Sequence, residues 1–162
     1  MSKHFWIFLI LGLAVTSGLV WLLLFSTQSA HLELTGSILK VRVLAMGKAS
    51  LVVVDFRATN PSGVPFVLKT AEIRLDPRVG EPVVASTISK VDMDNVFKYQ
   101  KLIGPKYNDA LGMRDRIPAG QTLDRMVAAR IELPESDVNR RKAIHLRLED
   151  LDGAMSEIDE KK

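Results

Sequence analysis

The chain has 162 residues, contains no cysteine and carries a formal net charge of +3. The lack of cysteine excludes a disulfide scaffold, thiolate metal sites and a cysteine nucleophile. The positive charge forms no face-sized basic run, so nucleic acid is not expected as a partner. The length suits one domain with an appendage.

The appendage is an apolar N-terminal segment. Residues 5–25 contain no charged side chain. At about 1.5 Å of rise per residue, a helix of this length measures roughly 30 Å, the thickness of a bilayer's hydrocarbon core. Trp6 and Trp21 lie near its two ends, where indole rings favour the headgroup layer. Residues 1–30 are therefore predicted to form a cytoplasmic stub and one transmembrane signal-anchor helix in contact with membrane lipid.

A cleaved signal peptide is the alternative to a retained anchor. The small residues Thr27 and Ser29 would allow cleavage before Ala30. The apolar run is longer than the roughly 7–15 residues usual in a signal peptide, which favours the anchor.

The flanks of the helix predict its orientation. Lys3 precedes it, and no lysine or arginine follows until Lys40. The positive-inside rule then places the N-terminus in the cytoplasm and the rest of the chain on the extracytoplasmic side, periplasmic or extracellular. Gly12, Ala14 and Gly18 are small positions within the helix. Ala14 and Gly18 lie on one helical face, which would permit a weak homodimer through the helix.

Alternating apolar and polar residues predict strands in the remainder. Residues 31–158 form the expected domain, and 159–162 a charged tail. The predicted strands are 31–44, 51–58, 66–76, 83–89, 122–133 and 143–151. In the strongest of them, the face expected in the core comprises Val52, Val54, Phe56 and Ala58. In the last, the core face comprises Ile144, Leu146 and Leu148.

Local signals interrupt these strands. Gly36 is expected to mark a β-bulge in the first strand. The helical spacing of Asp92–Ile103 predicts a short helix with Asp92 as its N-cap, ended by Gly104 and Pro105. Ser136 is expected to cap a further helical turn that runs to Arg141.

The order of these elements predicts the fold class. Several short strands separated by glycine- and proline-containing turns are typical of an all-β, antiparallel two-layer sandwich, here with one inserted short helix. A parallel α/β fold would need helices alternating with strands, and the sequence offers one good helix.

One part of the sequence resembles a known family. The strand LVVVDFRATNPSGVPF, with Asn60-Pro61 at its end, and the following LKTAEIRLD are similar to the water-stress and hypersensitive-response (WHy) domain of type 2 late-embryogenesis-abundant proteins. The turn IPAGQ and the strand ending in ELP extend the resemblance over about residues 45–133. The resemblance implies an immunoglobulin-like sandwich and a binding, membrane-associated or stress-protective role without enzymatic activity. The insertion Asp92–Arg116 departs from the family pattern, so no partner preference is carried over.

No catalytic, metal or cofactor site is expected. Asp92–Asn95 begins like a calcium loop, but Phe97 and Ile103 stand where an EF-hand requires glycine and glutamate. His31 and His145 would approach each other if the first and last strands paired, and they would still lack a third protein ligand. The sequence contains neither a Gly-x-Ser-x-Gly elbow nor a phosphate-binding glycine loop.

The candidate binding loop is the polar segment after the inserted helix. It combines Tyr107, Arg114, Asp115 and Arg116. The two guanidinium groups would suit carboxylate, phosphate or headgroup oxygens, with Asp115 holding them apart. Alternatively, Tyr107 packs the loop on the sheet and the charges are solvated. The predicted function is a membrane-anchored, non-enzymatic binding or stress-protective module. The alternative is a structural subunit of a larger envelope or secretion complex, with other envelope proteins as partners.

Overall fold

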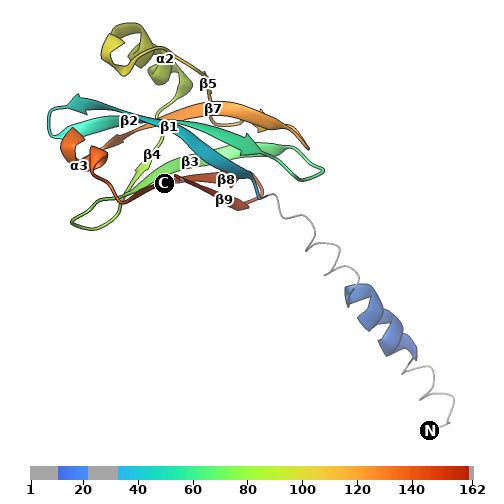
Figure 1. The fold of residues 1–162 in the computed structure, drawn as a ribbon. Coiled ribbons are helices and arrows are strands. Elements are labelled where there is room, and N and C mark those ends of the chain that lie inside the picture. Colours follow the sequence, from blue (N-terminus) through green and yellow to red (C-terminus); the bar gives the residue numbers. More distant parts are fainter. Residues whose placement is uncertain (1–10, 22–32, 161–162) are drawn as a thin grey trace, which may run out of the picture. The chain divides into compact units, whose positions relative to one another are not determined.

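A computed structural model describes residues 11–21 and 33–160 of the chain. The chain divides into two compact units, Met1–His31 and Leu32–Lys162. In the first unit, residues 11–21 form an α-helix whose side chains are all exposed (Figure 1). Among the residues that the structure describes, no helix combines the length and the apolarity needed to cross a bilayer.

The predicted anchor falls only partly within this helix. Gly12, Ala14, Gly18 and Trp21 belong to it, whereas Trp6 and the two ends of the apolar run lie outside the described residues. The anchor, its orientation and its self-association therefore stay predictions.

Within residues 33–160, two sheets make up most of the second unit. The first has the strand order β1-β2-β7-β5. Its strands are β1 (Thr35–Met46), β2 (Ala49–Thr59), β7 (Thr122–Ile131) and β5 (Asp109–Ala110). Neighbouring strands are antiparallel except that β5 runs parallel to β7, so the expectation of a wholly antiparallel arrangement is wrong at this short pairing.

The second sheet has the strand order β4-β3-β8-β9, and β6 pairs with the start of β3. Its strands are β3 (Phe66–Asp76), β4 (Val83–Ser86), β6 (Arg116–Ile117), β8 (Ala143–Asp150) and β9 (Met155–Asp159). The prediction of a mostly β domain built from two sheets is confirmed.

The main hydrophobic core lies between the two sheets. The alternating residues of β2 and β8 point into it as predicted, and Phe56 and Phe66 are fully buried there. Burial on one face explains the period-two pattern of β8. The core residues from the two strands are Val52, Val54, Phe56, Ala58, Ile144, Leu146 and Leu148.

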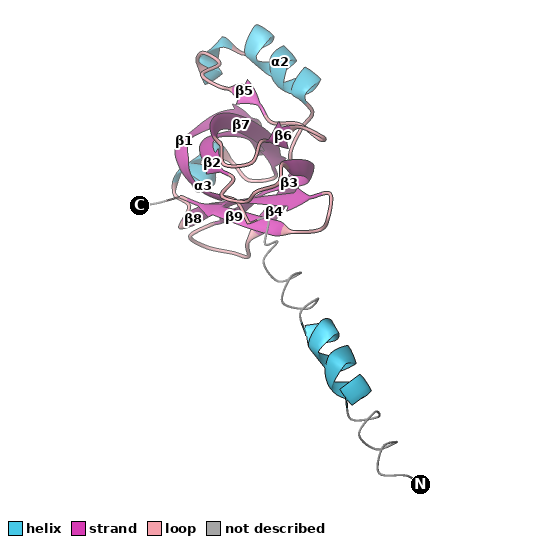
Figure 2. Ribbon diagram, turned by 90° about the vertical axis from the view of Figure 1, so that its right-hand side faces the viewer, coloured by secondary structure: helices cyan, strands magenta, loops and turns pink. Residues whose placement is uncertain are grey.

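A second, smaller core covers the outer face of the first sheet. The inserted segment forms α2 (Lys90–Tyr99) and the 3-10 helix η1 (Lys101–Ile103), which pack over β7 and β5 on the side away from the second sheet (Figure 2). Met93 and Ile103 from the insertion contact the β2 and β7 face that carries Val53 and Met126. Strand β2 is thus buried on both faces, which explains its continuous apolar run.

The bulge in β1 lies at Leu39 rather than at Gly36. The register with β2 shifts between Ile38 and Lys40, and Leu39 is about half exposed. Gly36 has a different role, because a Cβ atom there would lie 2.1 Å from the carbonyl oxygen of Arg57. The glycine is explained by close backbone approach, not by a change of face.

Both predicted helix caps are displaced. Ser89, not Asp92, is the N-cap of α2, and its hydroxyl accepts a hydrogen bond from the Asp92 amide. Helix α3 (Glu135–Asn139) begins after Pro134 and has no side-chain cap, so Ser136 lies inside it. Proline fits this position because its fixed φ suits the entry to a helix.

Candidate functional site

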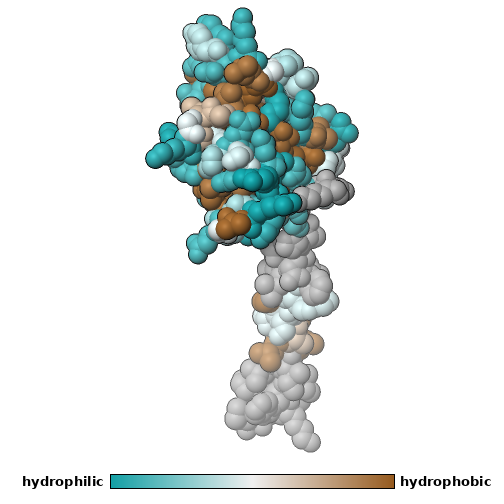
Figure 3. Space-filling view, turned by 60° about the vertical axis from the view of Figure 1, so that its left-hand side comes forward, coloured by the Kyte–Doolittle hydropathy of each residue, from teal (hydrophilic) through white to brown (hydrophobic). Residues whose placement is uncertain are grey.

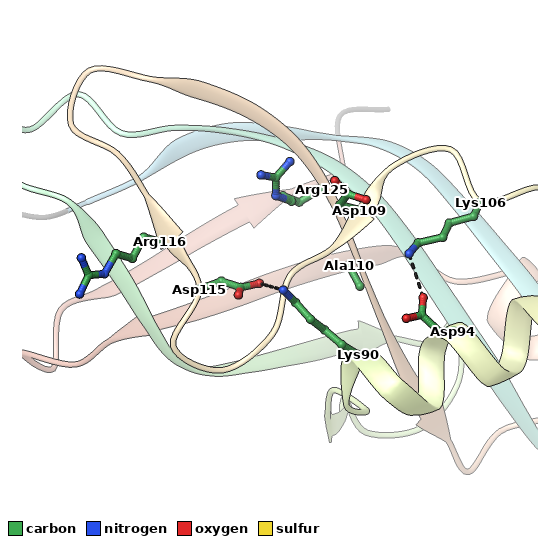
Figure 4. A pocket seen from close by; sticks show the side chains of 8 residues that line it. All are labelled: Lys90, Asp94, Lys106, Asp109, Ala110, Asp115, Arg116 and Arg125. Atoms are coloured by element: carbon green, nitrogen blue, oxygen red, sulfur yellow. Dashed lines mark hydrogen bonds and ion pairs between the residues drawn. The ribbon is translucent and has the colours of Figure 1, made fainter.

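A polar pocket lies where the inserted segment returns to the β domain. Its volume is about 270 Å³, and Figure 4 shows its lining. The residues are Lys90, Asp94, Lys106, Asp109, Ala110, Asp115, Arg116 and Arg125. They come from α2, the loop after η1, β5, the turn before β6, β6 and β7, so the pocket exists because the insertion is docked on the first sheet.

A buried ion pair holds that docking in place. Arg42 on β1 donates through Nε and Nη2 to Asp55 Oδ2 on β2, at 3.2 and 2.8 Å. Its Nη1 donates to the carbonyl oxygens of Ile103 and Pro105, at 3.1 and 2.8 Å. Asn108 donates to the other Asp55 oxygen at 3.0 Å. One arginine and one aspartate of the sheet therefore fix the backbone and a side chain of the insertion.

Tyr107 completes this structural cluster. The guanidinium of Arg42 lies 5.2 Å from the centroid of the Tyr107 ring, and Lys40 Nζ lies 4.8 Å from it. Cations at such distances are attracted to the face of an aromatic ring. The ring is still 57% exposed. Tyr107 thus covers the buried arginine and does not line the polar pocket, which weakens its predicted role as a ligand contact.

Arg114 has an unusual backbone conformation. Its φ is +66°, which non-glycine residues rarely adopt. Its amide donates to the Leu68 carbonyl at 2.7 Å, and the Leu68 amide donates to the Asp115 carbonyl at 2.9 Å. These two hydrogen bonds fix the loop to the edge of β3. The Arg114 side chain is exposed and forms no hydrogen bond or ion pair with the described residues.

Asp115 does not separate the two arginines as predicted. Its Oδ2 accepts a hydrogen bond from the Gly112 amide at 2.8 Å and pairs with Lys90 Nζ at 2.5 Å. A second ion pair, between Lys106 and Asp94 at 2.8 Å, is drawn on the other side of Ala110 (Figure 4). Asp115 is therefore a link between the loop and the start of α2.

Among the four predicted binding residues, Arg116 is the one that is exposed and lines the pocket. Its guanidinium has no hydrogen-bonding or ionic partner among the described residues. Arg125 also lines the pocket, and Asp109 is its neighbour in the β5–β7 pairing. With both lysines engaged by carboxylates, Arg116 is the side chain most available to an added anionic group. Such a group would gain charge-assisted hydrogen bonds.

The structure also explains Asn60, the first residue of the Asn-Pro pair. Asn60 is fully buried, and its Nδ2 donates to the carbonyl oxygens of Val64 and Ile117, at 2.8 and 3.0 Å. Its Oδ1 accepts from the amide and hydroxyl of Ser62. Asn60 therefore ties the turn after β2 to β6, and its role is structural.

Sequence reasoning missed three of the eight residues that line the pocket. Lys90, Asp94 and Arg125 come from segments outside the predicted loop, and nothing local marks them as neighbours. The molecule described so far is a two-sheet β domain with a docked helical insertion. No family model, curated protein or solved structure matches the chain.

Proposed function

We propose that the chain is a membrane-anchored, non-enzymatic module whose β domain, an immunoglobulin-like sandwich of the WHy type, binds anionic groups on the extracytoplasmic side. The observation that supports a binding role is that the guanidinium groups of Arg114 and Arg116 have no partner among the described residues. Both residues lie where the loop and β6 are hydrogen-bonded to β3. Rigid scaffolds that present exposed loop residues commonly carry binding. The phosphates of lipid headgroups are the anions nearest to an anchored domain.

The anchor is supported by the uncharged run of residues 5–25. Its described part, 11–21, exposes the large apolar side chains Leu11, Leu13, Leu19 and Trp21. Exposure of so many apolar residues on one helix is costly in water and favourable in lipid.

The anchor is expected to remain on the mature protein. Intact-mass measurement of the membrane-extracted chain should include residues 1–25, and alkaline carbonate should not release the protein. The physical reason is that a full-length apolar helix has no comparable stabilisation outside the bilayer. A mature N-terminus at Ala30 would contradict the anchor and support a cleaved signal peptide.

Replacing both arginines with glutamine, Arg114→Gln and Arg116→Gln, tests the binding role. On the segment 31–162, which lacks the anchor, the double change should weaken association with anionic phospholipid vesicles by roughly 30-fold at low salt. This factor assumes that each cationic side chain near an anionic surface contributes about 1 kcal/mol to the free energy of binding. A change of about 1.4 kcal/mol corresponds to a tenfold change in affinity. Vesicle co-sedimentation measures it, and wild-type binding should fall as salt is added.

The matched control is the double variant Arg78→Gln and Arg130→Gln. Both arginines are exposed and lie outside the loop, so the control removes the same charge. Both double variants should keep the stability of the parent, because exposed charges contribute little to it. Equal loss of binding in the two variants would mean that net charge alone, and not this loop, attracts the vesicles.

A structural subunit of a larger envelope or secretion complex is the second candidate. It is favoured by exposed apolar side chains on the insertion and the neighbouring β1–β2 hairpin: Leu102 is 90%, Tyr99 69% and Met46 52% exposed. Apolar surface is visible on this upper part of the β domain in Figure 3. A complex subunit should copurify in stoichiometric amount with envelope proteins after mild detergent extraction, whereas a stand-alone module should not.

A further inference from the structure

His145 lies between carboxylates on the outer face of the second sheet. It stands on β8, directly opposite Asp159 in the pairing with β9. Its Nδ1 is 2.6 Å from Asp159 Oδ1 and 3.3 Å from Glu157 Oε1. Its Nε2 is 3.5 Å from Asp76 Oδ2 on β3. Three adjacent strands therefore bring carboxylate oxygens to both nitrogens of one imidazole.

Arginine side chains fix two of these carboxylates from outside. Arg147 Nε donates to Glu157 Oε2 at 2.8 Å, and Arg74 Nε donates to Asp76 Oδ1 at 3.2 Å. Each of the two carboxylates thus gives one oxygen to an arginine and turns the other toward His145. These two carboxylates differ from freely solvated acids, because the arginine hydrogen bonds fix the orientation of the oxygens that face His145.

A neutral imidazole cannot satisfy this arrangement. It has one N–H donor and one lone pair, so one nitrogen would place its lone pair against a carboxylate. Either a proton or a metal cation at Nδ1 removes the conflict, because Nε2–H can then point toward Asp76 Oδ2, 3.5 Å away, while the oxygens of Glu157 and Asp159 face the positive charge. A carboxylate that accepts from the far nitrogen of a metal-bound histidine is the usual support of such ligands.

We propose that His145, Glu157 and Asp159 bind a zinc ion, through Nδ1 and one oxygen of each carboxylate, with Asp76 as the positioning residue at Nε2. Imidazole in the ligand set favours zinc over magnesium or calcium. Ligand atoms about 2.0–2.1 Å from a tetrahedral ion lie about 3.3 Å apart. The Nδ1–Glu157 distance already fits, the Nδ1–Asp159 distance must open by about 0.7 Å, and the Glu157 and Asp159 oxygens, which are up to 4.8 Å apart, must close by about 1.5 Å.

The bound ion would join β9 to β8 and leave its remaining coordination position to water or to a ligand atom from another molecule. Structural zinc sites usually use four protein ligands, so three ligands on an open sheet face give an accessible site. From sequence, no zinc site was expected, because His31 and His145 lacked a third protein ligand even if their strands paired. The strand β9, which supplies Glu157 and Asp159, was not anticipated.

Equilibrium dialysis of the full-length chain in mild detergent, with zinc alone as the probe, tests the proposal. The parent should bind one more equivalent of zinc than His145→Gln at micromolar concentrations. Asp159→Asn should weaken this binding about tenfold or more. Asp124→Asn is the matched control, because it removes the same charge from a partly exposed aspartate that is paired with Arg57 on the other sheet. It should bind zinc as the parent does.

Histidine ¹⁵N NMR gives a readout that does not depend on affinity. Zinc should shift the Nδ1 resonance of His145 to the position of a coordinated nitrogen and leave Nε2 protonated. Equal zinc binding by the parent and His145→Gln, an equal loss in Asp124→Asn, or coordination through Nε2 would each overturn the proposal. Far-UV circular dichroism of every variant shows that the loss of zinc is not a loss of fold.

Discussion

Asp55→Ala is expected to lower the free energy of unfolding of the β domain by about 3–5 kcal/mol, because it leaves Arg42 buried without its counter-ion. Asp55 is 2% exposed and Arg42 is 9% exposed. The change also removes the acceptor of Asn108. Urea denaturation of the segment 31–162 measures the loss.

Asp124→Ala is the control for this prediction. Asp124 pairs with Arg57 across β2 and β7 through two hydrogen bonds of 2.7 and 2.8 Å, one to each carboxylate oxygen, so this pair also joins an arginine and an aspartate by two hydrogen bonds. The hydrogen bond from Arg57 lowers the pKa of Asp124. The pair is exposed, however, and its removal should cost under about 1 kcal/mol. Equal losses in the free energy of unfolding for the two alanine variants would show that burial does not make the Arg42–Asp55 pair more important for stability than the Arg57–Asp124 pair.

Loss of Asp55 should also release the insertion. Arg42 holds the carbonyl oxygens of Ile103 and Pro105, and its orientation depends on Asp55. Trypsin should therefore cut after Lys101 and Lys106 faster in Asp55→Ala than in the parent, because cleavage of a native segment requires local opening. Unchanged cleavage there would mean that the hydrophobic contacts of α2 hold the insertion without the ion pair.

The sequence predicts those parts of the fold in which one face of a strand is buried. The bounds of β3 agree with the prediction at both ends, and the core face of β8 is correct, because alternation directly reports burial on one side. The second hydrophobic core was not predicted, although a local sequence pattern indicates it. The run Leu51–Val54 is apolar on both faces, as expected for a strand covered on two sides.

Other features depend on how strands align and on how the insertion docks, and no local sequence pattern marks them. Arg42 looks like an outward-facing residue of an alternating strand. Its pairing with Asp55 follows from the bulge at Leu39, which sets the β1–β2 register, and from the insertion that closes over both. The polar pocket depends on the same docking. Strand β9 has few apolar residues, so Glu157 and Asp159 could not be placed beside His145 from sequence.

Phe56→Ala is the second change with a large expected effect. Phe56 is fully buried, and its strand lies between β1 and β7, where it pairs with Ile38 and Arg125. Its ring fills the core between the sheets. Removal of a buried phenylalanine ring costs about 3–5 kcal/mol, because transfer free energy is lost and a cavity remains. Urea denaturation of the segment 31–162 should report this loss with little change in its slope.

Leu39→Ala is the comparison that makes this result informative. The alternation of β1 would place Leu39 in line with Val41 and Val43, whereas the bulge leaves Leu39 48% exposed. Truncation of a partly exposed leucine at an irregular position should lower the free energy of unfolding by under about 1 kcal/mol, since surface substitutions rarely have larger effects. The two variants should therefore differ by at least about 2 kcal/mol. A similar loss in both would place Leu39 in the core and the register shift elsewhere in β1, whereas a small loss for Phe56→Ala would mean that the faces of β2 are reversed.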